Sequence, residues 1–103
     1  ISSDLFGDAE NAKIEKSISI YPNPFSNGLK IHLMLETPGE TNVAVFDFSG
    51  RQARKLYEGY LERGDHQIEW DGRDAGGTVL SNGVYLVKIS TPDGVISKIM
   101  IKE

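Results

Sequence analysis

The chain has 103 residues, of which 39% are hydrophobic and 25% charged, with a formal net charge of -4 and no cysteine. This length suits one folded domain rather than a disordered segment. The absence of cysteine excludes disulfides and thiolate chemistry, and scattered basic residues in an acidic chain argue against a nucleic-acid partner. Apolar runs such as residues 84–87 fall far short of the roughly 20 residues of a helical membrane span, so we expect none.

Residues 1–16 are polar and lack an extended apolar face. A helical turn or two, with Asp8 as the N-cap, is the most regular structure that their sequence favours. The chain also opens with Ile1 rather than Met. We therefore interpret residues 1–16 as a linker or the tail of a preceding domain, and expect any export signal to lie further upstream.

From Ser17 onward, short segments with a period of two alternate with turn residues. The first segment, residues 17–21, ends at Pro22-Asn23-Pro24, because proline has a fixed φ and no N–H for a strand ladder. Residues 29–35 alternate apolar and polar side chains, which predicts a half-buried strand. After a turn, residues 41–48 form the third predicted strand.

The next segments are joined by glycine-containing turns. Residues 47–51 (DFSGR) predict a tight hairpin in which Gly50 adopts a left-handed conformation. Residues 52–61 predict a strand with a bulge at Gly59. In the strand that follows, three side chains should share one face: His66, Ile68 and Trp70. A long glycine-rich loop covers residues 71–82.

The last two predicted strands, residues 83–91 and 95–102, are joined by a Pro-Asp-Gly turn at residues 92–94. We expect the residues of one core face to be Tyr85, Val87, Ile89, Ser97, Ile99 and Ile101. The lysines that should face water, and so discourage aggregation at a sheet edge, are Lys88, Lys98 and Lys102. Connections this short cannot supply parallel crossovers. The sequence therefore predicts an all-β, antiparallel β-sandwich of about seven strands.

Residues that could carry chemistry are sparse. His32 and His66 stand apart from other metal-ligand residues, whereas zinc needs three or four converging ligands. No serine has the strand-turn-helix context of a nucleophile elbow. We therefore expect no catalytic residues and no cofactor.

The loop after the fifth strand is the best candidate for a metal site. Asp71 and Asp74 are three residues apart, but Arg73 adds a positive charge between them and no closing glutamate follows, unlike a calcium loop. We interpret these carboxylates as acceptors for the loop's own amides. Trp70 offers a sugar-stacking surface in principle, but its alternation with Ile68 favours a place in the core.

Five segments in order resemble the C-terminal sorting domains of the type IX secretion system. They are YPNPF (residues 21–25), FDFSGR (46–51), the stretch from Gly64 to Trp70-Asp71-Gly72, SNGVY (81–85) and KIMIK (98–102). The resemblance covers residues 17–103. The stretch from Trp70 to Tyr85 is equally similar to the immunoglobulin-like domain of the flagellar hook-capping protein.

The resemblance implies an immunoglobulin-like sandwich that is not an enzyme but a sorting signal of Bacteroidetes and related bacteria. Such a domain directs a secreted cargo protein across the outer membrane. The implied partners are the outer-membrane secretion machinery, its sortase-like peptidase and an N-terminal cargo domain, with the chain a monomer. The implied location is outside the cell or on its surface, reached through the periplasm. Cleavage would fall in the linker, near residues 7–9. The implied recognition residues are Pro22, Asn23, Pro24, Gly83, Tyr85, Lys98, Ile99, Met100, Ile101 and Lys102.

Two other functions stay open on the sequence alone. One is a structural or assembly module of the hook-cap type. The other is an accessory spacer or carbohydrate-binding module of a secreted glycoside hydrolase. Whether Glu103 ends the gene product would distinguish them, because a sorting domain must end there.

Overall fold

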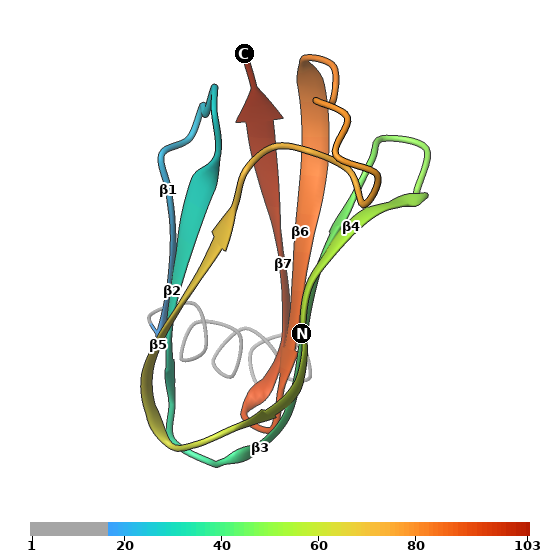
Figure 1. Ribbon diagram of the computed structural model, residues 1–103. Helices are drawn as coiled ribbons and strands as arrows, with labels where there is room; N and C mark the ends of the chain where they lie inside the picture. Colours follow the sequence, from blue (N-terminus) through green and yellow to red (C-terminus); the bar gives the residue numbers. More distant parts are fainter. Residues whose placement is uncertain (1–16) are drawn as a thin grey trace, which may run out of the picture.

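The computed structural model describes residues 17–103, which form seven β-strands and no helix (Figure 1). The strands are β1 (Ile18–Tyr21), β2 (Leu29–Leu35), β3 (Gly39–Phe46), β4 (Gln52–Leu61), β5 (Gly64–Trp70), β6 (Gly83–Thr91) and β7 (Gly94–Lys102). The predicted linker, with its helix cap and cleavage region, lies outside the described residues. Within residues 17–103, no helix long and apolar enough to cross a membrane is present.

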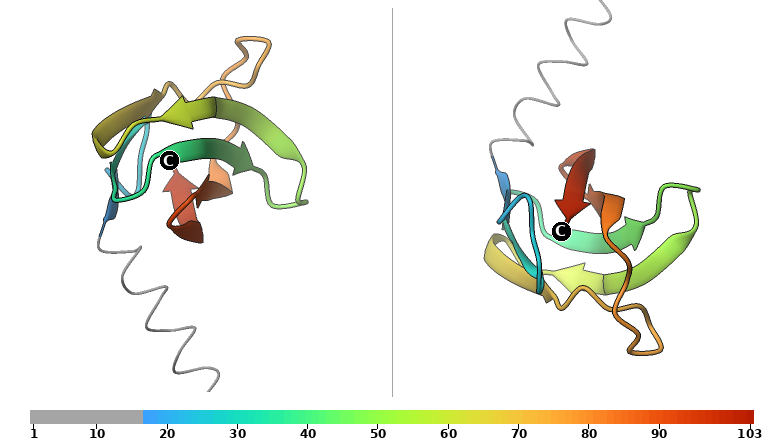
Figure 2. Two further views of the ribbon diagram at one scale, coloured as in Figure 1. Left: turned by 90° about the horizontal axis from the view of Figure 1, so that it is seen from below. Right: turned by 90° about the horizontal axis from the view of Figure 1, so that it is seen from above.

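The strands form two sheets, with the orders β1-β2-β5 and β4-β3-β6-β7. Neighbouring strands are antiparallel in both sheets. Seen from either end, the two sheets curve around a common interior (Figure 2). The predicted all-β, immunoglobulin-like antiparallel sandwich of about seven strands is confirmed.

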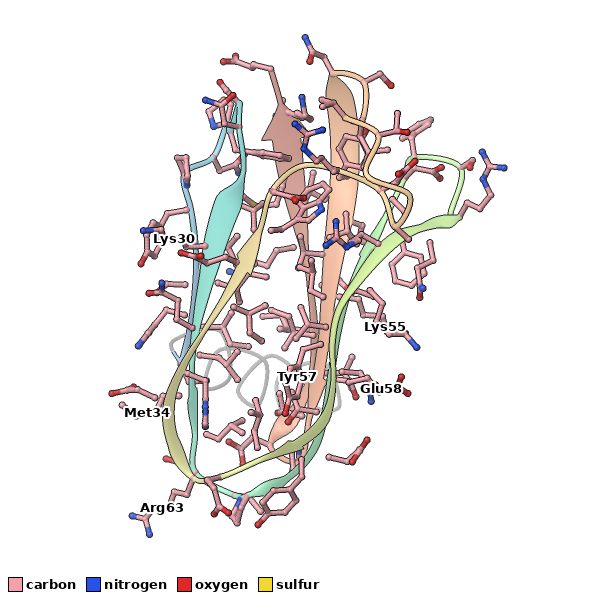
Figure 3. The ribbon with its side chains drawn as sticks, viewed as in Figure 1. Lys30, Met34, Lys55, Tyr57, Glu58 and Arg63 are labelled. Atoms are coloured by element: carbon pink, nitrogen blue, oxygen red, sulfur yellow. The ribbon has the colours of Figure 1, made fainter. Side chains whose placement is uncertain are left out.

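The core is made by the alternating apolar residues of the facing strands, whose side chains fill the space between the sheets (Figure 3). In β2 every second residue from Leu29 to Leu35 is almost fully buried. The residues that oppose them from the other sheet are Val43, Val45, Tyr85, Val87 and Ile89. Burying each such side chain contributes about 1.5–3 kcal/mol, so the alternation alone accounts for the stacking of the two layers.

The predicted inward face of β7 is wrong. Ile99 and Ile101 are exposed, whereas the buried residues of this strand are Ile96, Met100 and Lys102, with Lys98 half-buried on the same side. The reason is the turn: Thr91 pairs with Gly94, so the loop has two residues rather than the three that the sequence analysis assigned. Register then places Met100 opposite Tyr85, and directly paired residues share a face.

Two further details of the predicted strands need correction. β3 runs from Gly39 to Phe46, two residues earlier than expected. Gly59 pairs regularly with Thr41, and the irregular register of β4 lies instead around Leu56 and Ala53. Both bulges lie on an edge strand of the sheet, where bulges concentrate.

The predicted hairpin at residues 47–51 is confirmed. Gly50 has φ 89°, and its N–H donates to the carbonyl of Asp47. The Asp47 carboxylate accepts hydrogen bonds from the N–H and hydroxyl of Ser49 and from the N–H of Arg51. These bonds, led by the Ser49 hydroxyl, hold the pKa of Asp47 below its ordinary value of 3.8.

Candidate functional site

The end of β7 lies beside the loop that joins β1 to β2 (Figure 1). The Phe25 N–H donates to the Ile101 carbonyl at 2.9 Å, and the Glu103 N–H donates to the Phe25 carbonyl at 2.8 Å. Phe25 thereby forms a short parallel bridge with Lys102. The loop after β1 therefore joins the last strand of the opposite sheet and closes one corner of the sandwich.

Asn23 extends this bridge with its side chain. Its Oδ1 accepts the Ile101 N–H at 3.1 Å, and its Nδ2 lies 3.4 Å from the Ile99 carbonyl that it bonds. One amide thus satisfies a donor and an acceptor of a strand edge, as a neighbouring strand would. We call Asn23 and Phe25, with their bonds to β7, the β7 clamp. Pro22 and Pro24, which flank Asn23 after cis peptide bonds, are exposed.

Two aromatic residues, Trp70 and Tyr85, pack behind the β7 clamp and form an aromatic cluster with its Phe25. The ring of Trp70 lies 5.4 Å from that of Phe25 and 6.0 Å from that of Tyr85, measured between centroids, in tilted and edge-on arrangements that aromatic pairs prefer. The Trp70 Nε1–H donates to the Arg73 carbonyl, and the Tyr85 hydroxyl donates to the Ser81 carbonyl. Buried polar groups of both rings are therefore satisfied inside the domain.

This aromatic cluster decides two predictions about single residues. Trp70 is only 2% exposed, so it fills the core, as the alternation indicated, and presents no face to a sugar. Tyr85 is 5% exposed, so a partner cannot contact its ring directly. Tyr85 can affect recognition only by holding the exposed residues around it in place. Close packing continues at Gly28, where a Cβ would collide with the Trp70 carbonyl oxygen.

The loop after β5 is organised by its own hydrogen bonds. Asp74 Oδ1 accepts from the N–H groups of Gly76 and Thr78, and Asp71 Oδ1 accepts from the Arg73 N–H. Arg54 adds an ion pair to Asp71 at 3.2 Å. The two carboxylates therefore cap backbone amides, as predicted, and among residues 17–103 no group of three or more metal-ligating side chains is found.

The predicted recognition residues differ in their contacts and in their exposure. Asn23 is engaged in the β7 clamp, and Gly83, with φ 151°, adopts a backbone conformation that favours glycine. Tyr85, Met100 and Lys102 are buried, and Lys98 is half-buried. The exposed ones are Pro22, Pro24, Ile99 and Ile101.

Two exposed apolar residues escaped the sequence analysis. Phe48 is 89% exposed at the β3–β4 turn, and Val84 is 43% exposed on β6. Together with Ile99 they line a hollow of about 430 Å³ on the outer face of the four-stranded sheet. For Val84 the signal was present in the alternation, because Val84 has the parity opposite to the core residues of β6.

A second hollow, of about 550 Å³, lies between the strand ends of β1, β2 and β5. Its charged residues are paired with one another: Lys30 with Glu69 at 3.9 Å, and Arg54 with Asp71 at 3.2 Å. Lys30 projects outward from β2 in Figure 3. Exposed pairs of this kind contribute little stability and leave the hollow without a dominant charge.

Comparison with known families settles the class of the domain. Residues 25–94 match the family model described as the FlgD Ig-like domain. The chain belongs to this family. It is 36% identical over 61 residues to the basal-body rod modification protein FlgD of Salmonella typhimurium, and equally to that of Salmonella typhi. The match covers 58% of this chain and 26% of FlgD, so the chain spans about a quarter of the curated relatives' length.

Solved structures share this fold. PorU from Porphyromonas gingivalis, in its dimeric latent form, is 26% identical with a TM-score of 0.64, over 82% of this chain and 9% of PorU. PorZ, described as an essential surface component of the type IX secretion system of the same species, is 23% identical with a TM-score of 0.61, over 89% of this chain and 12% of PorZ. FlgD of P. aeruginosa is 21% identical, with a TM-score of 0.52, over 82% of this chain and 69% of that one. The chain is therefore an Ig-like domain of the FlgD type.

Proposed function

We propose that this FlgD-type Ig-like domain is a sorting signal that directs a secreted cargo protein through the type IX secretion system. The β7 clamp is the observation that carries the proposal. The Pro-Asn-Pro motif and the KIMIK segment, at opposite ends of the resemblance to sorting domains, meet there through Asn23 and Ile101. The likeness to PorU and PorZ of Porphyromonas gingivalis supports the same proposal.

The physical requirement for such a signal is a surface that stays fixed while the attached cargo varies. The β7 clamp and the aromatic cluster behind it hold the last strand in register, so that Ile99 and Ile101 are displayed in one arrangement. In this proposal, catalysis belongs to the cargo. The partners are the outer-membrane machinery and its sortase-like peptidase, and the final location is the cell surface or the medium.

A reporter fusion tests the proposal. A periplasmically exported fluorescent protein is fused before residues 1–103 and expressed in a bacterium that has the type IX system, and in a matched strain whose outer-membrane pore is deleted. We expect the reporter outside the cells of the first strain and in the periplasm of the second. A folded, intact fusion that stays periplasmic in both strains contradicts the proposal.

The alternative is an assembly module of the flagellar hook-cap type, favoured by the 36% identity to Salmonella FlgD. A domain exchange tests this role: the matching segment of Salmonella FlgD is replaced by residues 25–94 of this chain. Restored swimming in soft agar, with a stable chimera, favours the assembly role. Loss of swimming with normal chimera levels argues against it.

A further inference from the structure

β7 forms one edge of the four-stranded sheet (Figure 2). Both the N–H and the C=O of Ile101 point away from β6, since they bond Asn23 and Phe25. In an antiparallel pair, backbone groups of alternate residues point the same way, so those of Val95, Ser97 and Ile99 also face outward. Among the described residues, the β7 clamp covers only the last part of this edge. The Val95 and Ser97 groups and the Ile99 N–H have no hydrogen-bond partner there.

The side chains next to this open edge are apolar. Val84 pairs across the strands with Ile101, and Leu86 with Ile99, all on the outer face of the sheet. Ile99 is 63% exposed, and the hollow of about 430 Å³ extends from it to Phe48. An open strand edge beside exposed apolar side chains is complementary to an extended peptide, which supplies both ladder groups and alternate side chains.

The charge beside the β7 edge further limits which kind of segment can bind there. Of the three lysines of β6 and β7, only Lys88 lies on the outer face, because Lys102 is buried and Lys98 half-buried on the inner side. Lys88 is exposed and lines the hollow together with Asp47, whose carboxylate is already bonded to Ser49 and Arg51 within its own turn. A segment that fits this surface therefore carries a carboxylate near Lys88 and apolar side chains near Ile99 and Phe48.

We infer that the β7 edge and the adjoining hollow bind an extended, acidic and apolar segment of a partner protein by strand addition. Hydrogen bonds to Val95, Ser97 and Ile99 fix the register of the added strand. Apolar side chains on one of its faces cover the Phe48–Ile99 hollow, and a carboxylate pairs with Lys88. The identification of that partner as part of the secretion machinery rests on the proposed function, but the binding mode does not.

The test is an NMR titration of the full chain with a synthetic peptide that alternates valine with aspartate or threonine. We expect the largest amide shifts at Ser97 and Ile99. Ser97→Pro removes an outward N–H without breaking a bond to β6, and should weaken binding about tenfold, the equivalent of one or two lost hydrogen bonds. Ser97→Ala, which keeps the N–H, should bind as the wild type does.

Three results of the titration overturn the inference. They are equal binding by a folded Ser97→Pro variant, shifts confined to the β1-β2-β5 sheet, and no binding at millimolar peptide. A dimer of the chain that Ser97→Pro dissociates would assign the edge to a second copy and also overturns it. The reporter fusion separates the two proposals: if the wild-type and Ser97→Pro domains are exported equally, the partner bound at the β7 edge is not the secretion machinery, while sorting stands. If the wild-type fusion is not exported, sorting fails and the titration alone decides the binding mode.

Discussion

At the scale of single residues, Asn23 links two segments that are far apart in the sequence. Its side chain bonds backbone groups of Ile99 and Ile101, 76 and 78 residues away. The sequence analysis marked Asn23 for recognition through its motif, whereas its contacts are internal. No local pattern could have predicted them, because a bond between a side chain and a distant backbone leaves no periodicity in either segment.

Asn23→Ala should lower the free energy of unfolding by about 0.5–1.5 kcal/mol, since it removes hydrogen bonds to β7 at an exposed site. Urea unfolding measures the loss, and faster hydrogen exchange at the Ile101 amide locates it. Asn27→Ala, the same change within the same loop, is the control and should leave this amide protected. Unchanged exchange in Asn23→Ala would show that the side chain does not hold the strand.

Asp47 provides a prediction about pH. Because hydrogen bonds in the folded state favour its carboxylate, its folded pKa lies below its unfolded one. The resulting stabilisation is present at neutral pH and is lost as the pH falls through the folded pKa. An NMR titration should therefore place the Asp47 midpoint below 3.8, and Ser49→Ala should raise it. A wild-type midpoint at or above 3.8 would contradict this assignment.

At the scale of elements, the positions of the strands were predictable from the sequence, but the face of β7 that points into the core was not. In β2, apolar residues alternate with polar or exposed ones, and this alternation determines which side chains point into the core. β7 is apolar on both faces, with Ile96 and Met100 inside and Ile99 and Ile101 outside, so alternation alone could not choose. The turn decided it: a loop of two residues instead of three moves every side chain of β7 to the other face.

Tyr85 tests the inward face of β6 and, through its pairing with Met100, the register of β7. Tyr85→Ala should cost about 3–5 kcal/mol, because it empties a core position beside Trp70. Tyr85→Phe keeps the ring and should lose only about 1 kcal/mol with the bond to the Ser81 carbonyl. Chemical denaturation measures both. A loss near zero in Tyr85→Ala would place this ring outside the core.

At the scale of the molecule, the fold follows from composition and alternation, but the functional surface does not. Apolar residues on the wet side of strands, such as Val84 and Ile99, look like ordinary strand formers until cross-strand register brings them beside Phe48. The family model and the solved structures establish an Ig-like module. The sorting role rests on five short motifs, two of which meet at the β7 clamp.

The most direct measurement of this role is the fraction of reporter found outside cells that carry the type IX system, when the reporter is fused to the full chain. Protease resistance of the fusion confirms that the domain is folded. We predict that most of the reporter is external with the wild-type domain and that it returns to the periplasm when the secretion pore is deleted. A folded fusion that remains in the periplasm while the pore is present would contradict the sorting role.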